Sequence, residues 1–225
     1  MKKITVLLAE DHMIVREGFR KMLELENDLQ VVGEAENGRQ AVAMVKKLRP
    51  AVVLMDIAMP LLNGLEATRQ VLKALPATKV LILSAHSDDA YVKNATESGA
   101  VGFLLKQTSS HIVCEAIREV QKGKTFFSPT VARRLHQLDG KSLDQAGRSQ
   151  SRNARLTSRE MEVLQLIAEG KANKETAAEL GISIKTVEKH RERVMSKLKI
   201  HDTAGLTRYA ISAGIIESSV QLTIV

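Results

Sequence analysis

Residues 52–56 read Val-Val-Leu-Met-Asp, and this stretch decides the fold of the first half of the chain. Four consecutive apolar residues without polar alternation are typical of a strand that is buried on both faces of a parallel sheet. Four further runs share this character and are predicted to be strands: Ile4–Ala9, Gln30–Glu34, Val80–Leu83 and Gly102–Leu105.

Segments with the apolar spacing of helices separate these runs. They include Ile14–Leu25, Arg39–Lys47, Ala67–Ala74 and Ser110–Gln121. Strands that alternate with helices form parallel sheets with helices on both faces, and their crossovers are right-handed. Residues 1–123 are therefore predicted to form an α/β domain of five βα units around a five-stranded parallel sheet.

The chain has 225 residues, enough for two domains, and its net charge of +7 is unevenly distributed. Residues 1–123 carry a net charge of +1, whereas residues 124–225 carry +6. The basic half suits a polyanionic partner, although a basic solvated surface explains the charge alone equally well. Aromatic residues make up only 3% and Trp is absent, which argues against stacking platforms for single-stranded nucleic acid.

The second half has a different pattern. Residues 140–154 are dominated by small polar residues and are predicted to be a flexible linker, and Pro129–Leu138 suits a short helix ahead of it. From Arg155 onward the pattern is purely helical, and four helices are expected. Their predicted N-caps are Thr157 (in a capping box with Glu160), Asn173, Ser183 and Asp202.

The remaining composition excludes other classes of protein. Cys114 is the only cysteine, so an internal disulfide cannot form, and the six histidines show no metal-ligand spacing. The apolar run near Met1 is too short for a signal peptide and is interrupted by Glu10-Asp11, and no stretch is long enough to span a membrane. We therefore expect a cytoplasmic protein without membrane contact.

Charged and hydroxyl side chains follow four of the predicted strands: Glu10 and Asp11, Asp56, Ser84, and Lys106. The carboxyl ends of parallel strands meet at one edge, where α/β sheets bind their ligands. Crowded carboxylates repel one another unless a cation intervenes, and a hard divalent ion, most simply Mg²⁺, meets that need. With Lys106 and Ser84 to contact phosphoryl oxygens, an Asp nucleophile at this edge can form an acyl phosphate.

Residues 1–123 resemble a two-component receiver domain. The matching motifs are Glu10-Asp11, Met55-Asp56 with Met59-Pro60, Asn63-Gly64, Ser84-Ala85 and Phe103-Leu-Leu-Lys106. The resemblance implies a flavodoxin-like (βα)5 fold in which Asp56 accepts a phosphoryl group and Lys106 contacts it. It also implies a Mg²⁺ ion held by Glu10, Asp11, Asp56 and the backbone carbonyl of Ala58.

The same resemblance assigns a conformational switch to Ser84 and Phe103, whose side chains would change rotamer together. The chain departs from the receiver pattern at two positions. Phe103 stands where Tyr is common, and Gln107 stands where many receivers have Pro. Neither departure removes a chemical group that phosphoryl transfer needs.

The helix expected from Ser183 to Leu198 has the composition of a DNA-recognition helix. One face is apolar and is predicted to enter the core, with Val187, Val194 and Leu198. Other positions carry long polar side chains, namely Lys185, Glu188, Lys189, Glu192, Arg193 and Lys197. Major-groove helices use such side chains for base edges and cations for phosphates. The alternative is an exposed helix laced with ion pairs, because Glu188 and Arg191 lie at an interacting spacing.

Further motifs favour the first interpretation. Leu156-Thr-Ser-Arg-Glu160, Ala177-Ala-Glu-Leu-Gly-Ile-Ser183 and Thr186-Val-Glu-Lys-His190 resemble the LuxR-type helix-turn-helix. With the receiver ahead of it, the chain resembles a response regulator of the NarL/FixJ family. This implies base contacts by Lys185, Glu188, Lys189 and Glu192, and backbone contacts by Thr186, His190, Arg193 and Lys197.

The resemblance also implies partners and boundaries. The expected partners are a sensor histidine kinase, double-stranded promoter DNA, a second copy of the chain bound through the helix near Thr203–Ala213, and RNA polymerase. The predicted organisation is a receiver at 1–123, a linker at 124–154, a helix-turn-helix domain at 155–217 and a tail at 218–225.

Two other functions fit parts of the sequence. A phosphatase or phosphotransferase of the haloacid dehalogenase type would require a second Asp two residues after Asp56, where this chain has Ala58. A regulator whose receiver only dimerises would have no need for the complete set of acidic, hydroxyl and lysine residues. We therefore predict a transcription regulator switched by phosphorylation. Apart from Mg²⁺-dependent self-phosphorylation and slow dephosphorylation, we expect it to have no enzymatic activity.

Overall fold

The computed structural model describes residues 3–85, 89–127, 131 and 156–216. The chain forms two compact units, Met1–Arg148 and Ser149–Val225. The predicted linker at 140–154 and tail at 218–225 lie outside the described residues, as does the predicted helix Pro129–Leu138 apart from Val131.

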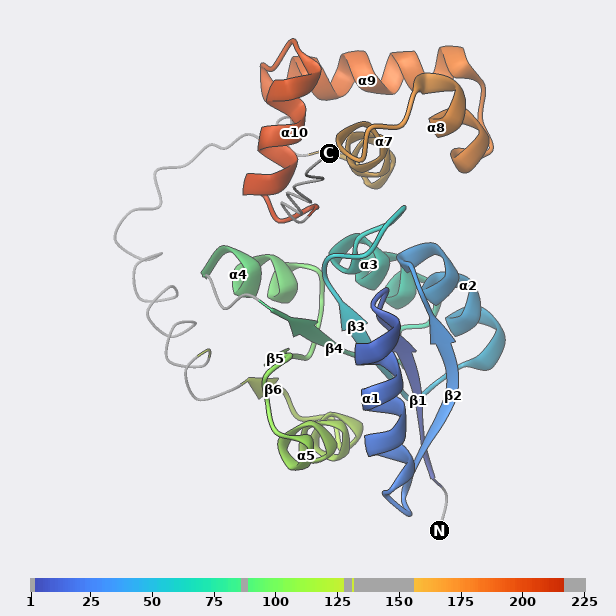
Figure 1. The fold of residues 1–225 in the computed structure, drawn as a ribbon, viewed down its shortest axis with the longest axis vertical. Coiled ribbons are helices and arrows are strands. Elements are labelled where there is room, and N and C mark those ends of the chain that lie inside the picture. The colour runs from blue at the N-terminus through green and yellow to red at the C-terminus, as the bar shows by residue number, and fades with distance from the viewer. Residues whose placement is uncertain (1–2, 86–88, 128–130, 132–155, 217–225) are drawn as a thin grey trace, which may run out of the picture. The chain divides into compact units, whose positions relative to one another are not determined.

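The first unit is built on a parallel sheet with the strand order β2-β1-β3-β4-β5-β6 (Figure 1). The strands are β1 (Ile4–Ala9), β2 (Leu29–Ala35), β3 (Val52–Asp56), β4 (Lys79–Ser84), β5 (Gly102–Leu105) and β6 (Phe126–Phe127). All five predicted strands are confirmed, with ends that differ by at most one residue. Strand order reverses between β1 and β3, and α/β sheets generally bind their ligands at the carboxyl ends of the strands beside such a reversal.

The sixth strand corrects the prediction of five. Phe126 and Phe127 pair in parallel with Gly102 and Phe103, and the amide of Phe126 donates to the carbonyl of Val101 at 2.9 Å. A two-residue strand carries too little pattern for recognition in the sequence. Gly102 permits the pairing, because a Cβ atom there would lie 2.4 Å from the carbonyl oxygen of Phe126.

Helices cover both faces of the sheet. They are α1 (Met13–Glu24), α2 (Gly38–Leu48), α3 (Gly64–Ala74), α4 (Asp89–Glu97) and α5 (Ser110–Gln121). One apolar cluster joins alternate strand residues to α2, α3 and α4, and the other joins the intervening strand residues to α1 and α5. This alternation is the physical reason that the strand segments are apolar throughout, since successive side chains enter opposite cores.

The second unit contains the helices α7 (Ser158–Ala168), α8 (Asn173–Leu180), α9 (Ile184–Leu198) and α10 (Thr203–Ser212). The predicted capping box at the start of α7 is confirmed, and Ser183 and Asp202 cap α9 and α10 as expected. The cap predicted at Asn173 is wrong, since Asn173 is already helical. The side chain of Glu175 reaches back to the amide of Ala172 instead, at 2.8 Å.

A small apolar core orients α9 against its neighbours. Its buried members include Val163, Leu164 and Ile167 from α7, Ala177 from α8, Val187 and Val194 from α9, and Leu206 and Ala210 from α10. Leu198, which was predicted to be core, is only half-buried. Gly181 makes the turn between α8 and α9 with a φ of 61°, a conformation that glycine adopts without a steric cost.

Across the described segments, each helix is either too short or too polar to traverse a lipid bilayer.

Candidate functional site

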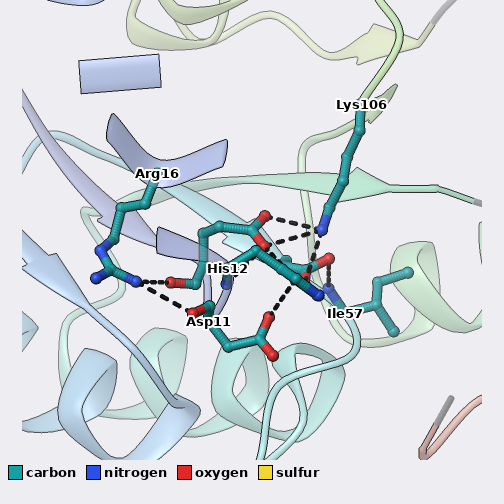
Figure 2. Close-up of polar contacts among 7 residues, drawn as sticks. Asp11, His12, Arg16, Ile57 and Lys106 are labelled. Atoms are coloured by element: carbon teal, nitrogen blue, oxygen red, sulfur yellow. Dashed lines mark hydrogen bonds and ion pairs between the residues drawn. The ribbon is translucent and has the colours of Figure 1, made fainter. Parts of the chain in front are cut away.

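The carboxyl ends of β1, β3 and β5 bring three charged groups into direct contact. The ammonium of Lys106 lies 3.0 Å from Oδ2 of Asp56 and 2.8 Å from Oε2 of Glu10. Figure 2 shows Lys106 reaching into the cluster near Asp11, His12 and Ile57. Asp56 is the last residue of β3, and Lys106 directly follows β5. The sequence placed these residues at one edge of the sheet, and the fold brings them within ion-pair distance.

Asp56 is held rigidly. Its side chain is buried, and its Oδ1 accepts a hydrogen bond of 2.8 Å from the amide of Ile57. Gly64 packs against its backbone so closely that a Cβ atom would lie 1.8 Å from the carbonyl oxygen of Asp56. The loop after β3 is closed by a hydrogen bond of 2.8 Å from the amide of Gly64 to the carbonyl of Ile57. Asn63-Gly64 matches a receiver motif, but the sequence alone does not reveal this packing role.

Burial and the neighbouring carboxylate of Glu10 raise the pKa of Asp56 to about 7, and Lys106 offsets only part of this. Burial also works against the charged form of Lys106, but Asp56 and Glu10 outweigh it and raise the pKa of the ammonium. The carboxylates are therefore crowded beyond what one lysine neutralises. A divalent cation would relieve this repulsion.

His12 lies in the same cluster, although the histidines of the sequence show no metal-ligand spacing. Its Nδ1 lies 3.0 Å from Oε1 of Glu10 and 3.0 Å from Oδ1 of Asp11. The hydrogen bond to Glu10 and the charge of Asp11 raise the pKa of His12. Three adjacent residues in a loop show no ligand periodicity, so the pattern of histidines could not reveal this contact.

The acidic cluster fits a hard divalent cation. Glu10, Asp11, His12 and Asp56 each offer a ligand atom, and these four atoms lie within 4.8 Å of one another. Carboxylate oxygens dominate the set, as Mg²⁺ prefers. Ala58, the predicted carbonyl ligand, follows Asp56 by two residues and is half-buried.

The two predicted switch residues lie on neighbouring strands. Ser84 ends β4 and is buried, and the amide of Lys106 donates to its carbonyl at 2.8 Å. Phe103 in β5 is fully buried in the cluster that faces α2, α3 and α4. The ring therefore lies inside the core.

In the second unit, α9 presents a polar surface. Lys185, Glu188, Lys189, Glu192 and Arg193 are all exposed, whereas Val187 and Val194 are buried. Among the described residues, Glu188 forms no ion pair with Arg191. The guanidinium of Arg191 donates to Thr203 at 2.5 Å and to Asn173 at 3.5 Å. The alternative of a helix laced with ion pairs is therefore not favoured on this surface.

Two of the predicted backbone-contact residues are engaged within the unit. Lys197 forms an ion pair of 2.6 Å with Oε2 of Glu160 in α7. His190 is half-buried, and burial together with the charge of Arg159 lowers its pKa, which favours the neutral ring. The resemblance to the LuxR-type helix-turn-helix assigned both side chains to DNA phosphates by their position in the motif. The sequence alone could not show that α7 packs against this part of α9.

Comparisons with known proteins agree with both units. Residues 6–118 match the model of the response regulator receiver domain, and residues 154–210 match bacterial regulatory proteins of the luxR family. The chain is 37% identical over 214 residues to the transcriptional regulatory protein MctR of Rhizobium johnstonii, covering 95% of this chain and 96% of MctR. It is 39% identical over 207 residues to LiaR of Bacillus subtilis, covering 92% and 96%.

Solved structures give the same result. The response regulator RcsB of Salmonella typhimurium aligns with a TM-score of 0.62 and 29% identity, over 95% of this chain and 99% of RcsB. An RcsB–DNA complex aligns with a TM-score of 0.58 and 29% identity, over 94% and 99%. The fold and the acidic edge thus define a two-component response regulator with a LuxR-type DNA-binding domain. The chain belongs to the NarL/FixJ family of these regulators and acts in the control of transcription.

Proposed function

We propose that Asp56 is the phospho-acceptor through which a sensor histidine kinase controls DNA binding by this chain. The observation that carries the proposal is the bridge that Lys106 makes between Asp56 and Glu10 at the switch point of the sheet. In the transfer, an oxygen of Asp56 forms a bond to phosphorus while the bond from phosphorus to the donor breaks. The product is an acyl phosphate, and Lys106 balances the charge of the transferred group.

Mg²⁺ is the proposed cofactor, with Glu10, Asp11, Asp56 and the carbonyl of Ala58 as the residues that would hold it. When bound, it would supply charge neutralisation for the phosphoryl oxygens. Glu10 is almost fully buried, so its oxygens are presented by a fixed backbone. The chain's own part is to gather these oxygens before the donor arrives.

Ser84 and Phe103 are proposed to carry the signal away from the site. Ser84 ends the strand beside Asp56 and can donate its hydroxyl hydrogen to a phosphoryl oxygen. Phe103 lies on the next strand, so that a shift of Ser84 changes the space available to its ring. We propose no hydroxyl-dependent step at position 103, because the residue is Phe.

For DNA recognition we propose that α9 enters the major groove of promoter DNA. Lys185, Glu188, Lys189 and Glu192 would face base edges, and Thr186 and Arg193 would contact the backbone. We omit Lys197 from the phosphate contacts because its ammonium is paired with Glu160. His190 is retained only as a neutral hydrogen-bonding group.

The proposed output is a dimer on DNA, formed through α10 and strengthened by the phosphorylated receivers. Receiver dimerisation would raise the effective concentration of the second DNA-binding unit. The receiver is proposed to end after β6, since Phe126–Phe127 join its sheet, and not at residue 123 as predicted. The DNA-binding unit is kept at 155–217, with a linker between the two. RNA polymerase is a further proposed partner. The location follows as cytoplasmic, because bacterial promoter DNA lies there.

The experiment is intact-mass measurement after incubation of the full chain with acetyl phosphate and Mg²⁺. We expect one added phosphoryl group on the wild type, none on Asp56→Asn, and none after chelation of the metal. Asp28→Asn is the matched control, because Asp28 is a carboxylate paired with Arg118 away from the acidic cluster. Equal labelling of the wild type and Asp56→Asn would reject the assignment.

A further inference from the structure

Arg16 is a nearly buried charge in α1 that the proposed function does not use. It lies one turn into the helix that follows the acidic loop, and 7% of its surface is exposed. A buried guanidinium is costly unless its donors are satisfied and its charge is balanced. The partners of Arg16 therefore indicate why the charge is placed there.

Its donors divide between two kinds of acceptor. One terminal nitrogen, Nη1, donates to the backbone carbonyl of Glu10 at 2.7 Å and reaches the carbonyl of Asp11 at 3.4 Å (Figure 2). The other nitrogens face the end of β2, where Nε lies 3.3 Å from Oε2 of Glu34 and Nη2 lies 2.9 Å from Oε1 of Glu36. The guanidinium thus joins the end of β2 to the acidic loop.

The contact with the loop is made through backbone and not through side chains. Consecutive residues of extended backbone point their side chains to opposite sides. Glu10 and Asp11 depart from this pattern, because carboxylate oxygens of both lie 3.0 Å from Nδ1 of His12. The backbone must therefore bend so that both carboxylates point toward His12. We infer that Arg16 holds this bend in place, because it binds the backbone carbonyls of the same two residues.

The charge arrangement also favours this role. Glu34 and Glu36 balance the charge of Arg16, so the guanidinium fixes the loop without neutralising the carboxylates of Glu10 and Asp11. Those carboxylates stay available to a cation on the far side of the backbone. An Arg with fork geometry can serve both sets of acceptors at once, whereas a Lys ammonium cannot.

We propose that Arg16 is a positioning residue for the divalent cation, acting through the backbone of Glu10 and Asp11. The inference rests on the proposed function, which assigns the cation to Glu10, Asp11 and Asp56. Loss of a residue that orients metal ligands reduces metal affinity by about 10- to 100-fold. Arg16 is therefore expected to set the Mg²⁺ concentration at which the receiver works, and not the maximal rate of phosphorylation.

The competing explanation is that Arg16 only fastens α1 to β2. Arg20 provides the control, because it lies on the same helix and its Nε is 3.4 Å from Oε1 of the same Glu34. Unlike Arg16, it has no contact with the carbonyls of the acidic loop among the described residues. A purely structural role predicts that any loss of Mg²⁺ affinity follows the loss of stability, in Arg20→Met as in Arg16→Met.

The test is calorimetric titration of the unphosphorylated full chain with Mg²⁺. Arg16→Met should raise the dissociation constant by about 10- to 100-fold, Arg16→Lys should raise it less, and Arg20→Met should leave it unchanged. With acetyl phosphate as donor, Arg16→Met should need more Mg²⁺ for half-maximal phosphorylation but reach the wild-type rate at saturation.

Unchanged Mg²⁺ affinity in a folded Arg16→Met variant would overturn the inference, as would an equal loss in Arg20→Met. Should Arg16→Met fail to fold, Arg16→Lys and Glu36→Gln carry the test, because both weaken the anchor and leave helix α1 intact. Wild-type affinity in both would again overturn it. A wild type that binds no Mg²⁺ would reject the proposed function and this inference together. If the wild type binds Mg²⁺, the proposed cation site stands, and the variants then test the role of Arg16 alone.

Discussion

Lys197 and Glu160 form an ion pair of 2.6 Å that joins the C-terminal end of α9 to the first turn of α7. Glu160 has a second task, since its carboxylate also accepts from the amide of Thr157 at 2.8 Å and completes the capping box. One buried carboxylate therefore supports both the start of the DNA-binding unit and the orientation of α9.

This pair predicts acid sensitivity of the second unit. Burial disfavours the carboxylate of Glu160, but hydrogen bonds from Lys197 and Thr157 outweigh it and lower its pKa. A carboxyl group whose pKa is lower in the folded state contributes stability above its unfolded pKa and loses it as the pH falls through the folded value. We expect the protection factors of amides in α7 and α9, measured by hydrogen-exchange mass spectrometry and corrected for the slower intrinsic exchange in acid, to fall below about pH 4.5. Glu160→Gln should exchange faster at neutral pH and show a weaker acid dependence. An unaltered acid profile in Glu160→Gln would contradict this.

Lys197→Met should lower the free energy of unfolding of the second unit by about 1–3 kcal/mol, because it leaves a buried carboxylate without its charged partner. The expected consequence is weaker DNA binding with no change in salt dependence. Calorimetry and a salt titration of DNA binding check the two parts. A variant of wild-type stability with a reduced salt slope would instead restore Lys197 to the phosphate contacts.

Two exposed residues of α9 should differ in what they contact. Lys189→Ala should cost about 1–3 kcal/mol at the cognate operator and little on random duplex. Arg193→Ala should weaken binding to both duplexes alike and reduce the salt slope by about 1. Lys73→Ala, an exposed lysine of the receiver, is the control and should change neither. Identical behaviour of Lys189→Ala and Arg193→Ala on the two duplexes would disprove the proposed orientation of α9.

The pKa of Asp56, raised to about 7 by burial and by Glu10, predicts an opposite pH dependence for the first unit. A carboxyl whose pKa is higher in the folded state binds protons more tightly there, so metal-free stability falls as the pH rises from about 4 to 7. Asp56→Asn should be the more stable protein at neutral pH, by on the order of 1–4 kcal/mol. Added Mg²⁺ should reduce this difference in stability between the wild type and Asp56→Asn. Thermal unfolding with and without the metal measures both effects, and a wild type that gains stability over this pH range without metal would refute the prediction.

Gly64 should be intolerant of a side chain, because a Cβ atom would lie 1.8 Å from the carbonyl oxygen of Asp56. Gly64→Ala is expected to shift Asp56, slow labelling by acetyl phosphate and lower stability by about 1–3 kcal/mol. Gly18→Ala is the matched control, since Gly18 lies in α1 with no atom within 4 Å of its added Cβ. That change should raise stability by up to about 1 kcal/mol. Equal effects of the two substitutions would argue against the packing role of Gly64.

Thr176 in α8 is fully buried, and its hydroxyl has no hydrogen-bond partner among the described residues. Thr176→Val replaces an unsatisfied polar group by an apolar one of similar shape and should stabilise the second unit by about 1 kcal/mol. Thr68 is the control, because its buried hydroxyl donates to the carbonyl of Gly64 at 2.6 Å. Thr68→Val should destabilise the first unit. Denaturant unfolding distinguishes the two, and a destabilising Thr176→Val would show that the hydroxyl has a partner.

Much of the architecture was readable from local sequence, because local physics decides it. The five apolar strand segments and the caps at Thr157, Ser183 and Asp202 depend on neighbours within a few residues. The convergence of Asp56 and Lys106 was also predictable, since the carboxyl ends of parallel strands share an edge.

Tertiary structure alone decided the features that depend on which surfaces meet. β6 forms because Gly102 leaves space beside β5, and two residues carry no periodicity of their own. His12 and Arg16 take their places from a bend in one loop, and Lys197 takes its partner from a helix 37 residues away in sequence. The periodicity of a sequence indicates which residues of a helix face away from the core. It does not indicate which residue of another element will contact them, because that depends on how the elements pack together.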